Sequence, residues 1–161
     1  MYYNVLGILF FLLSLGPGVS QRNRLIKDDG MFLLQAITID DRYYEEASKT
    51  VDFIKKYIFP GCCIPSQEII SKHISKDTDY QLYHIDDITY DYALTLNHWL
   101  KNFRENIQEI KEMGYNEHFR RMWEYYLQYC EGGFLERAIG VGQFLYVKQG
   151  AKQLKKPPSY E

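Results

Sequence analysis

The 161-residue sequence lacks the short motifs that mark the most familiar catalytic and nucleotide-binding sites. It has no GxGxxG loop, no P-loop, no HExxH pair and no Ser-His-Asp spacing, which argues against a glycine-rich dinucleotide site, a phosphate-binding loop and a zinc peptidase centre. Its four histidines show no metal-ligand spacing, and we interpret each as an exposed or half-buried helix residue: they are His73, His84, His98 and His118. The residues alone therefore carry a weak catalytic signal.

Cysteine and net charge are also scarce. Cys62, Cys63 and Cys130 form no CxxC pair, so a structural zinc site is not expected, and an odd count with two adjacent members does not make a disulfide framework. Reduced thiols are typical of a cytoplasmic protein. Cys130 falls on an apolar helix face, where packing is its expected role. The net charge of −2 argues against nucleic acid as a partner.

The apolar leader, residues 1–22, contains a run from Val5 to Leu15 that at about eleven residues is too short to span a bilayer. Three origins stay open for this leader. It could be foreign sequence joined to a truncated gene. It could be a signal peptide with Gly18 and Ser20 near the cleavage site, although no positive charge precedes the apolar run. It could also be an anchor or a core helix.

Aromatic residues are abundant, at 16% of the chain with 15 tyrosines. A wall of tyrosines suits a pocket that is apolar along its length and polar at one end, whereas half-buried surface positions are the simpler interpretation for most of them. The 46% apolar and 25% charged residues are ordinary for one folded globular domain.

The pattern of apolar residues predicts an α/β protein with three strands, at residues 31–39, 80–88 and 141–148. The first is a near-continuous apolar run, typical of a strand buried on both faces of a parallel sheet. Amphipathic helices are expected at residues 44–58, 66–70, 92–110 and 119–130. Three strands make an incomplete sheet, and the helices need a partner layer that these residues do not supply.

Polar residues next to these elements are expected to cap helices. Asp40 and Asp41 follow the first strand and can cap the next helix, Ser66 starts the short helix that follows, and Asn116 precedes the last helix. The Asp86-Asp87 pair lies at a strand end, where it is either a cap for the next helix or part of a ligand site.

Several segments together resemble the C-terminal part of the cyclopropane-fatty-acyl-phospholipid synthase family. They are Ile58-Phe59-Pro60-Gly61 followed by Pro65-Ser66, Tyr92-Ala93-Leu94-Thr95-Leu96 followed by Trp99, and Arg121-Met122-Trp123-Glu124-Tyr125-Tyr126-Leu127. They fall in the family's order and spacing, and the resemblance covers residues 24–149. Matched segments in order are more specific than any one of them alone.

The resemblance implies the C-terminal portion of a class I methyltransferase, a Rossmann-like fold, for residues 23–161. Residues 31–39 would be the fifth strand of its sheet, and the other two predicted strands the last two. The implied reaction is methylene transfer from S-adenosylmethionine to unsaturated acyl chains of phospholipids, by a cytoplasmic protein that is peripheral at the membrane surface.

The resemblance also implies a bound bicarbonate that serves as the base. Carried over by position, its ligands in this part of the family are the side chain of Gln35, a backbone group of Ile37 and the side chain of Tyr92. Gln35 stands where some members have histidine, which keeps a hydrogen-bond donor and loses a protonation switch. Without the resemblance, Gln35 is a structural strand residue and Tyr92 a core aromatic. Thr89 and Asp91 depart from the glycine and histidine of many relatives.

The front half of the family has no counterpart here. The glycine-rich cofactor loop, the acidic residue for the ribose, and the Glu and Cys that bind bicarbonate are all missing. We therefore expect this chain alone to bind no S-adenosylmethionine and to be inactive, as a truncated or split enzyme that pairs with a chain carrying the N-terminal half. The alternative is a non-catalytic module that binds lipid or complements a partner.

Overall fold

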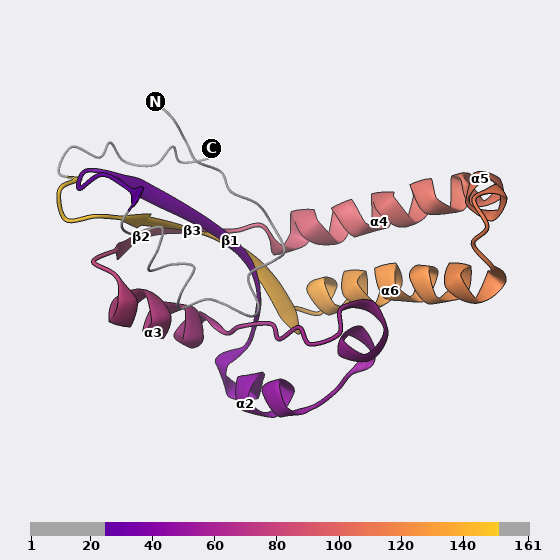
Figure 1. Cartoon of the computed structure of the whole chain (residues 1–161), viewed down its shortest axis with the longest axis horizontal. Coiled ribbons are helices and arrows are strands. Elements are labelled where there is room, and N and C mark those ends of the chain that lie inside the picture. The colour runs from indigo at the N-terminus through magenta and orange to yellow at the C-terminus, as the bar shows by residue number, and fades with distance from the viewer. Residues whose placement is uncertain (1–24, 152–161) are drawn as a thin grey trace.

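A computed structural model describes residues 25–151, in which three strands form one antiparallel sheet. Strands β1 (Met31–Ile39), β2 (Gln81–Asp87) and β3 (Ile139–Val147) lie in the order β1-β3-β2, so that central β3 pairs with both neighbours (Figure 1). The three strands predicted from sequence are confirmed to within two residues at each end. The apolar leader and the C-terminal tail lie outside the described residues.

The expectation of a parallel, doubly buried first strand is wrong within the described residues. The ladder of β1 is antiparallel, with Gln35 opposite Gln143, and its one parallel contact is an isolated bridge from Ile39 to Ser66. Along most of β1, buried residues alternate with half-buried ones, so the two faces of the strand are not covered equally. A run of apolar residues on both faces indicates a covered strand, but it contains no information about the direction of the neighbouring strand.

The helices are α2 (Asp41–Lys49), the π-helical turn η1 (Ile54–Ile58), α3 (Gln67–Asp77), α4 (Thr89–Glu105), α5 (Ile107–Glu112) and α6 (Glu117–Leu135). The helix expected over residues 44–58 is therefore broken. Thr50 is extended, and the Asp52 side chain accepts from the backbone N–H of Lys55, so that Asp52 starts a new turn. The helix expected over residues 92–110 is also divided, at Asn106.

The predicted caps are confirmed. Side chains of Asp40, Ser66 and Asn116 accept hydrogen bonds from backbone N–H groups in the first turns of α2, α3 and α6. Asp87 Oδ1 likewise accepts from Thr89 N at 3.0 Å, which supports the capping interpretation of the Asp86-Asp87 pair.

Two apolar clusters lie on opposite faces of the sheet, because successive strand residues alternate between faces. The first cluster joins the sheet to α3 and comprises Phe32, Leu34, Ile70, Ile74, Tyr80, Phe144 and Tyr146. The second joins the sheet to α4 and α6 and comprises Ala93, Leu96, Leu100, Leu127, Phe134 and Val141. The second cluster carries the site described below.

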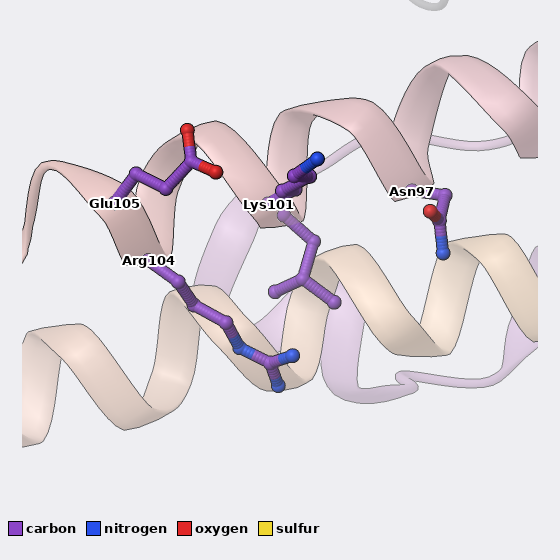
Figure 2. A pocket seen from close by; sticks show the side chains of 5 residues that line it. Asn97, Lys101, Arg104 and Glu105 are labelled. Atoms are coloured by element: carbon purple, nitrogen blue, oxygen red, sulfur yellow. The ribbon is translucent and has the colours of Figure 1, made fainter.

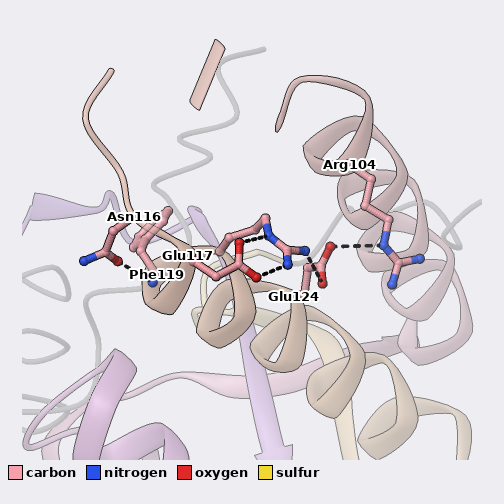
Figure 3. A network of polar contacts seen from close by, with 6 residues as sticks. Arg104, Asn116, Glu117, Phe119 and Glu124 are labelled. Atoms are coloured by element: carbon pink, nitrogen blue, oxygen red, sulfur yellow. Dashed lines mark hydrogen bonds and ion pairs between the residues drawn. The ribbon is translucent and has the colours of Figure 1, made fainter. Parts of the chain in front are cut away.

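Helices α4 and α6 run side by side and extend beyond the sheet as a long hairpin, with α5 at its far end (Figure 1). An ion-pair network crosses this hairpin (Figure 3): Glu124 accepts from Arg104 of α4 at 3.4 Å and pairs with Arg120 of α6 at 3.3 Å, and Arg120 also pairs with Glu117. Partly exposed pairs of this kind contribute little stability each, so the apolar cluster supplies most of the attraction between the two helices.

Candidate functional site

The structure places Gln35 and Ile37 on one face of β1, because residues two apart in a strand point to the same side. Ile37 packs against the second apolar cluster, the one that joins the sheet to α4 and α6. Tyr92, in the first turns of α4, packs against that same cluster. The three residues assigned by resemblance therefore belong to one face of the sheet and to the helix that covers it.

The side chain of Gln35 is held by a residue that the sequence analysis did not single out. Gln143 lies directly opposite Gln35 on β3, and its Nε2 donates to Gln35 Oε1 at 2.9 Å. Within residues 25–151 the Gln35 side chain makes no other hydrogen bond. Its own NH₂ group is thus left as a donor. The signal that could have found Gln143 is a lone amide within an apolar strand.

The backbone of Ile37 points its polar groups away from β3. Two residues further on, Ile39 N–H donates to Pro65 O at 3.0 Å, on the outer edge of β1. Since backbone N–H groups alternate in direction along a strand, the N–H of Ile37 faces that same edge. No described strand pairs with this edge between Met31 and Thr38.

Tyr92 presents a neutral hydroxyl beside an apolar surface. Its ring meets Phe134 edge-on, with centroids 5.2 Å apart, and its hydroxyl has no hydrogen-bond partner within the described residues. Burial raises the pKa of Tyr92 above its ordinary value, and the neighbouring Cys130 thiol adds to the rise. The phenol therefore stays protonated at neutral pH and can donate to an anion.

The start of α4, one turn before Tyr92, is fixed to the sheet by polar contacts. Buried Thr89 accepts from Val141 N at 3.0 Å through its hydroxyl, and Asp87 also pairs with Arg137. Hydrogen bonds from Thr89, followed by the contact with Arg137, hold the pKa of Asp87 below its usual range despite partial burial. Thr89 thus ties the start of α4 to β3.

The other residues considered from the sequence, Cys130 and the four histidines, lie in surroundings that indicate a structural role. Cys130 is half-buried against the second cluster, and burial, with a smaller effect of Asp52, raises the pKa of its thiol to about 12, which fits the packing role expected for it. His73, His98 and His118 lie in helices as expected, but His84 lies in β2, so its assignment to a helix is wrong.

Two grooves flank the hairpin. An apolar groove of about 480 Å³ is lined by Phe59, Trp99, Asn102, Phe103, Trp123, Tyr126 and Leu127. A second groove, of about 390 Å³, is lined by Asn97, Leu100, Lys101, Arg104 and Glu105, whose charges are mixed (Figure 2). Within the described part of the chain, no three histidine, cysteine or acidic side chains gather as a metal site, and no helix has the length and apolar content to cross a membrane.

Residues 19–144 match the family model for mycolic acid cyclopropane synthetase. The chain belongs to this family. The chain is 32% identical over 127 residues to the tuberculostearic acid methyltransferase UfaA1 of Mycobacterium tuberculosis. This match covers 79% of the chain and 30% of UfaA1. It is 34% identical over 125 residues to the cyclopropane-fatty-acyl-phospholipid synthase of Escherichia coli, covering 77% of this chain and 31% of that enzyme.

Solved structures agree on the fold. The mycolic acid cyclopropane synthase CmaA1, solved in complex with SAH and CTAB, superposes with a TM-score of 0.71 at 25% identity, over 83% of this chain and 50% of CmaA1. The cyclopropane synthase MmaA2 of Mycobacterium tuberculosis gives a TM-score of 0.72 at 23% identity. The chain thus has the fold of part of a class I methyltransferase. It spans about a third of the length of these curated relatives and half of these solved chains.

Proposed function

We propose that this chain is the C-terminal part of an enzyme that transfers a methylene group from S-adenosylmethionine to unsaturated acyl chains of phospholipids. The observation that carries the proposal is a set of three donors around one part of β1: the Gln35 amide on the face of the sheet, the Ile37 N–H at the outer edge beside it, and the Tyr92 hydroxyl on the covering helix. All three are neutral donors, and they border an apolar cluster. Such a group can hold a small anion in surroundings of low polarity.

The residues present fit bicarbonate as that anion. Gln35 would offer its free NH₂ group, Ile37 its outward N–H and Tyr92 a protonated hydroxyl, whose pKa burial raises further. Bound bicarbonate supplies the base for the proton that leaves the transferred methyl group. The task of this chain is to orient that anion and to exclude water around it, and the apolar second cluster supports both.

The apolar groove between α4 and α6 suits the acyl chain. Trp99, Phe103 and Trp123 contribute aromatic surface to it, and Trp99 is 49% exposed, so one wall of the groove is open to solvent. An enzyme that modifies the acyl chains of phospholipids would work at a membrane surface, which suits a peripheral protein on the cytoplasmic side. Exposed aromatic residues are common where a protein meets the lipid interface.

The cofactor site belongs, in this proposal, to a chain that carries the N-terminal half. The outer edge of β1 is where that half would pair, since backbone N–H and C=O groups on an open edge pair readily with another strand. S-adenosylmethionine would bind to the partner rather than to this chain.

Two measurements test the proposal. The full chain is produced together with the N-terminal segment of the Escherichia coli relative, in cells that lack their own synthase, and cyclopropane fatty acids are measured by mass spectrometry. We expect product only when both parts are present. Calorimetry on the full chain alone should detect no binding of S-adenosylmethionine.

Three outcomes would count against this assignment. Micromolar binding of S-adenosylmethionine by the chain alone would refute the division of labour. No product with both parts present, although they co-purify, would refute the catalytic role. Binding of the chain to phosphatidylglycerol vesicles without any product would favour the non-catalytic lipid-binding module.

A further inference from the structure

We propose that Gln143 is a positioning residue, which orients the side-chain amide of Gln35 so that its NH₂ group, and not its oxygen, is presented to the anion. The inference rests on the proposed function, because it concerns the same anion site. The inference goes beyond the proposed function because it assigns a role to Gln143, a strand residue that need not touch the anion itself. The observation behind it is the hydrogen bond of 2.9 Å from Gln143 Nε2 to Gln35 Oε1.

A glutamine amide has two ends with opposite hydrogen-bonding character. Its oxygen accepts only, its nitrogen donates only, and a half-turn about the last side-chain torsion exchanges them. Because Gln35 Oε1 already accepts from Gln143, the orientation that leaves the NH₂ group available is the favoured one. An anion needs a donor. The opposite orientation would place the partial negative charge of the oxygen against it.

The location of Gln143 makes it suited to this task. It lies on the central strand β3, opposite Gln35 of β1 on one side and Asp86 of β2 on the other, so its strand is flanked on both sides. Its neighbours two residues away on the same face are Val141, which is buried, and Leu145, which is half-buried. An amide among such residues costs free energy unless it is hydrogen-bonded, so the bond to Gln35 is retained.

Asp86 completes a row of three polar side chains across the sheet, in the order Gln35, Gln143, Asp86. Within the described residues Asp86 makes no hydrogen bond with Gln143, and the Gln143 amide is turned with its Nε2 toward Gln35 and away from Asp86.

The test uses four variants that separate orientation from charge and shape. Gln143→Met keeps the length of the side chain and removes both polar ends. Gln143→Glu offers only an acceptor, so it should turn the Gln35 amide and direct its oxygen at the anion. Gln35→Met removes the amide, and the double variant Gln35→Met with Gln143→Glu measures the effect of the new charge alone. Gln81→Glu, on an exposed residue of β2, is the matched control for a Gln→Glu change in this sheet.

The full 161-residue chain is titrated with sodium bicarbonate, with sodium chloride as the control for ionic strength. Binding is followed by the side-chain NH₂ signals of Gln35 in ¹⁵N-resolved NMR spectra, and by backbone signals in variants that lack Gln35. We expect Gln143→Met to weaken binding several-fold and Gln143→Glu by tenfold or more, in line with the loss or reversal of one hydrogen bond to a charged group. Gln81→Glu should leave binding unchanged.

If the chain alone gives no dispersed NMR spectrum, the same variants are made in the chain joined to the N-terminal segment of the Escherichia coli relative. The readouts are then the rise in melting temperature caused by bicarbonate and the bicarbonate concentration for half-maximal turnover. A positioning role predicts that Gln143→Glu raises this concentration while the apparent KM for lipid stays constant. A merely structural role would lower the melting temperature and leave the bicarbonate dependence as it was.

The outcomes distinguish the two proposals. If neither the wild type nor any variant binds bicarbonate, or if Gln35→Met binds it as well as the wild type, the anion site itself is wrong, and the role of Gln143 fails with it. If Gln35→Met weakens binding but Gln143→Glu and Gln143→Met do not, the anion site stands and the positioning role is refuted. If Gln143→Glu costs as much without Gln35 as with it, the effect is one of charge, and the role is again refuted.

Discussion

Replacing Thr89 by valine should weaken the attachment of α4 to the sheet with little change of shape. Thr89 is 2% exposed, and its hydroxyl accepts from Val141 N at 3.0 Å. The substitution exchanges the hydroxyl for a methyl group of similar size, so it leaves a buried N–H without an acceptor. That costs about 1–3 kcal/mol, and loss of the hydrogen bond to the Asp87 carboxylate adds to it. We expect a total of about 2–4 kcal/mol.

The assay is urea unfolding of the full chain, followed by circular dichroism at several pH values. Thr89→Ser is the control: it keeps the hydroxyl and loses one methyl group, for about 1 kcal/mol. The pKa of Asp87 is lowered in the fold, so its stabilising contribution is present above its unfolded pKa of about 3.9 and is lost as the pH falls through the lower folded value. The deficit of Thr89→Val should therefore be largest above about pH 5 and shrink on acidification. Thr89→Ser costing more than Thr89→Val would refute the reasoning.

Three further predictions concern the site residues and the residues packed around them. In the chain joined to the N-terminal segment of the Escherichia coli relative, Tyr92→Phe and Gln35→Ala should each lower turnover about 100-fold, since one preorganised donor is worth roughly 2.7–4 kcal/mol; full activity of both variants would remove these residues from the site. Cys130 should be the last cysteine to react with iodoacetamide at pH 8, because its thiol has a pKa of about 12; early labelling, read by mass spectrometry, would contradict its burial. Gly132→Ala, with open space around it, should raise the melting temperature because alanine has the higher helix propensity, and Gly133→Ala should raise it less, because its new methyl group would lie 3.3 Å from Ile139 side-chain atoms; a larger rise for Gly133→Ala would contradict this packing.

The sequence was most informative where a local rule acts alone. Asp40, Ser66 and Asn116 were recognisable as caps because a cap needs only a short polar side chain before an apolar periodic segment. The three strands were found for the same reason, from runs of apolar and β-branched residues. Strand direction was not, because whether β1 pairs in parallel depends on residues far away in the chain. The break at Thr50 was missed because an apolar stripe can continue through a segment that is not helical.

The candidate site shows the same division. Gln35, Ile37 and Tyr92 came from resemblance to a family, and neither period nor spacing would have singled them out. Gln143 escaped notice because its significance depends on the pairing of β1 with β3, which puts it opposite a residue 108 positions earlier. In a three-stranded sheet, register decides which polar side chains meet, and a single sequence contains little information about register.

The proposed anion site also limits how a partner can pair with β1. The outer edge of β1 is already occupied at its end, where Ile39 bridges Ser66 in parallel and donates to Pro65 O. If the N–H of Ile37 holds the anion, it cannot also bond to a partner strand, so that strand must stop short of Ile37 and pair only with the segment before it. Hydrogen exchange on the complex should then show strong protection by the partner at Leu33 N–H, and protection at Ile37 N–H that depends on bicarbonate. Protection of Ile37 by the partner alone would mean that its N–H belongs to the sheet, and the anion would be held by Gln35 and Tyr92 without it.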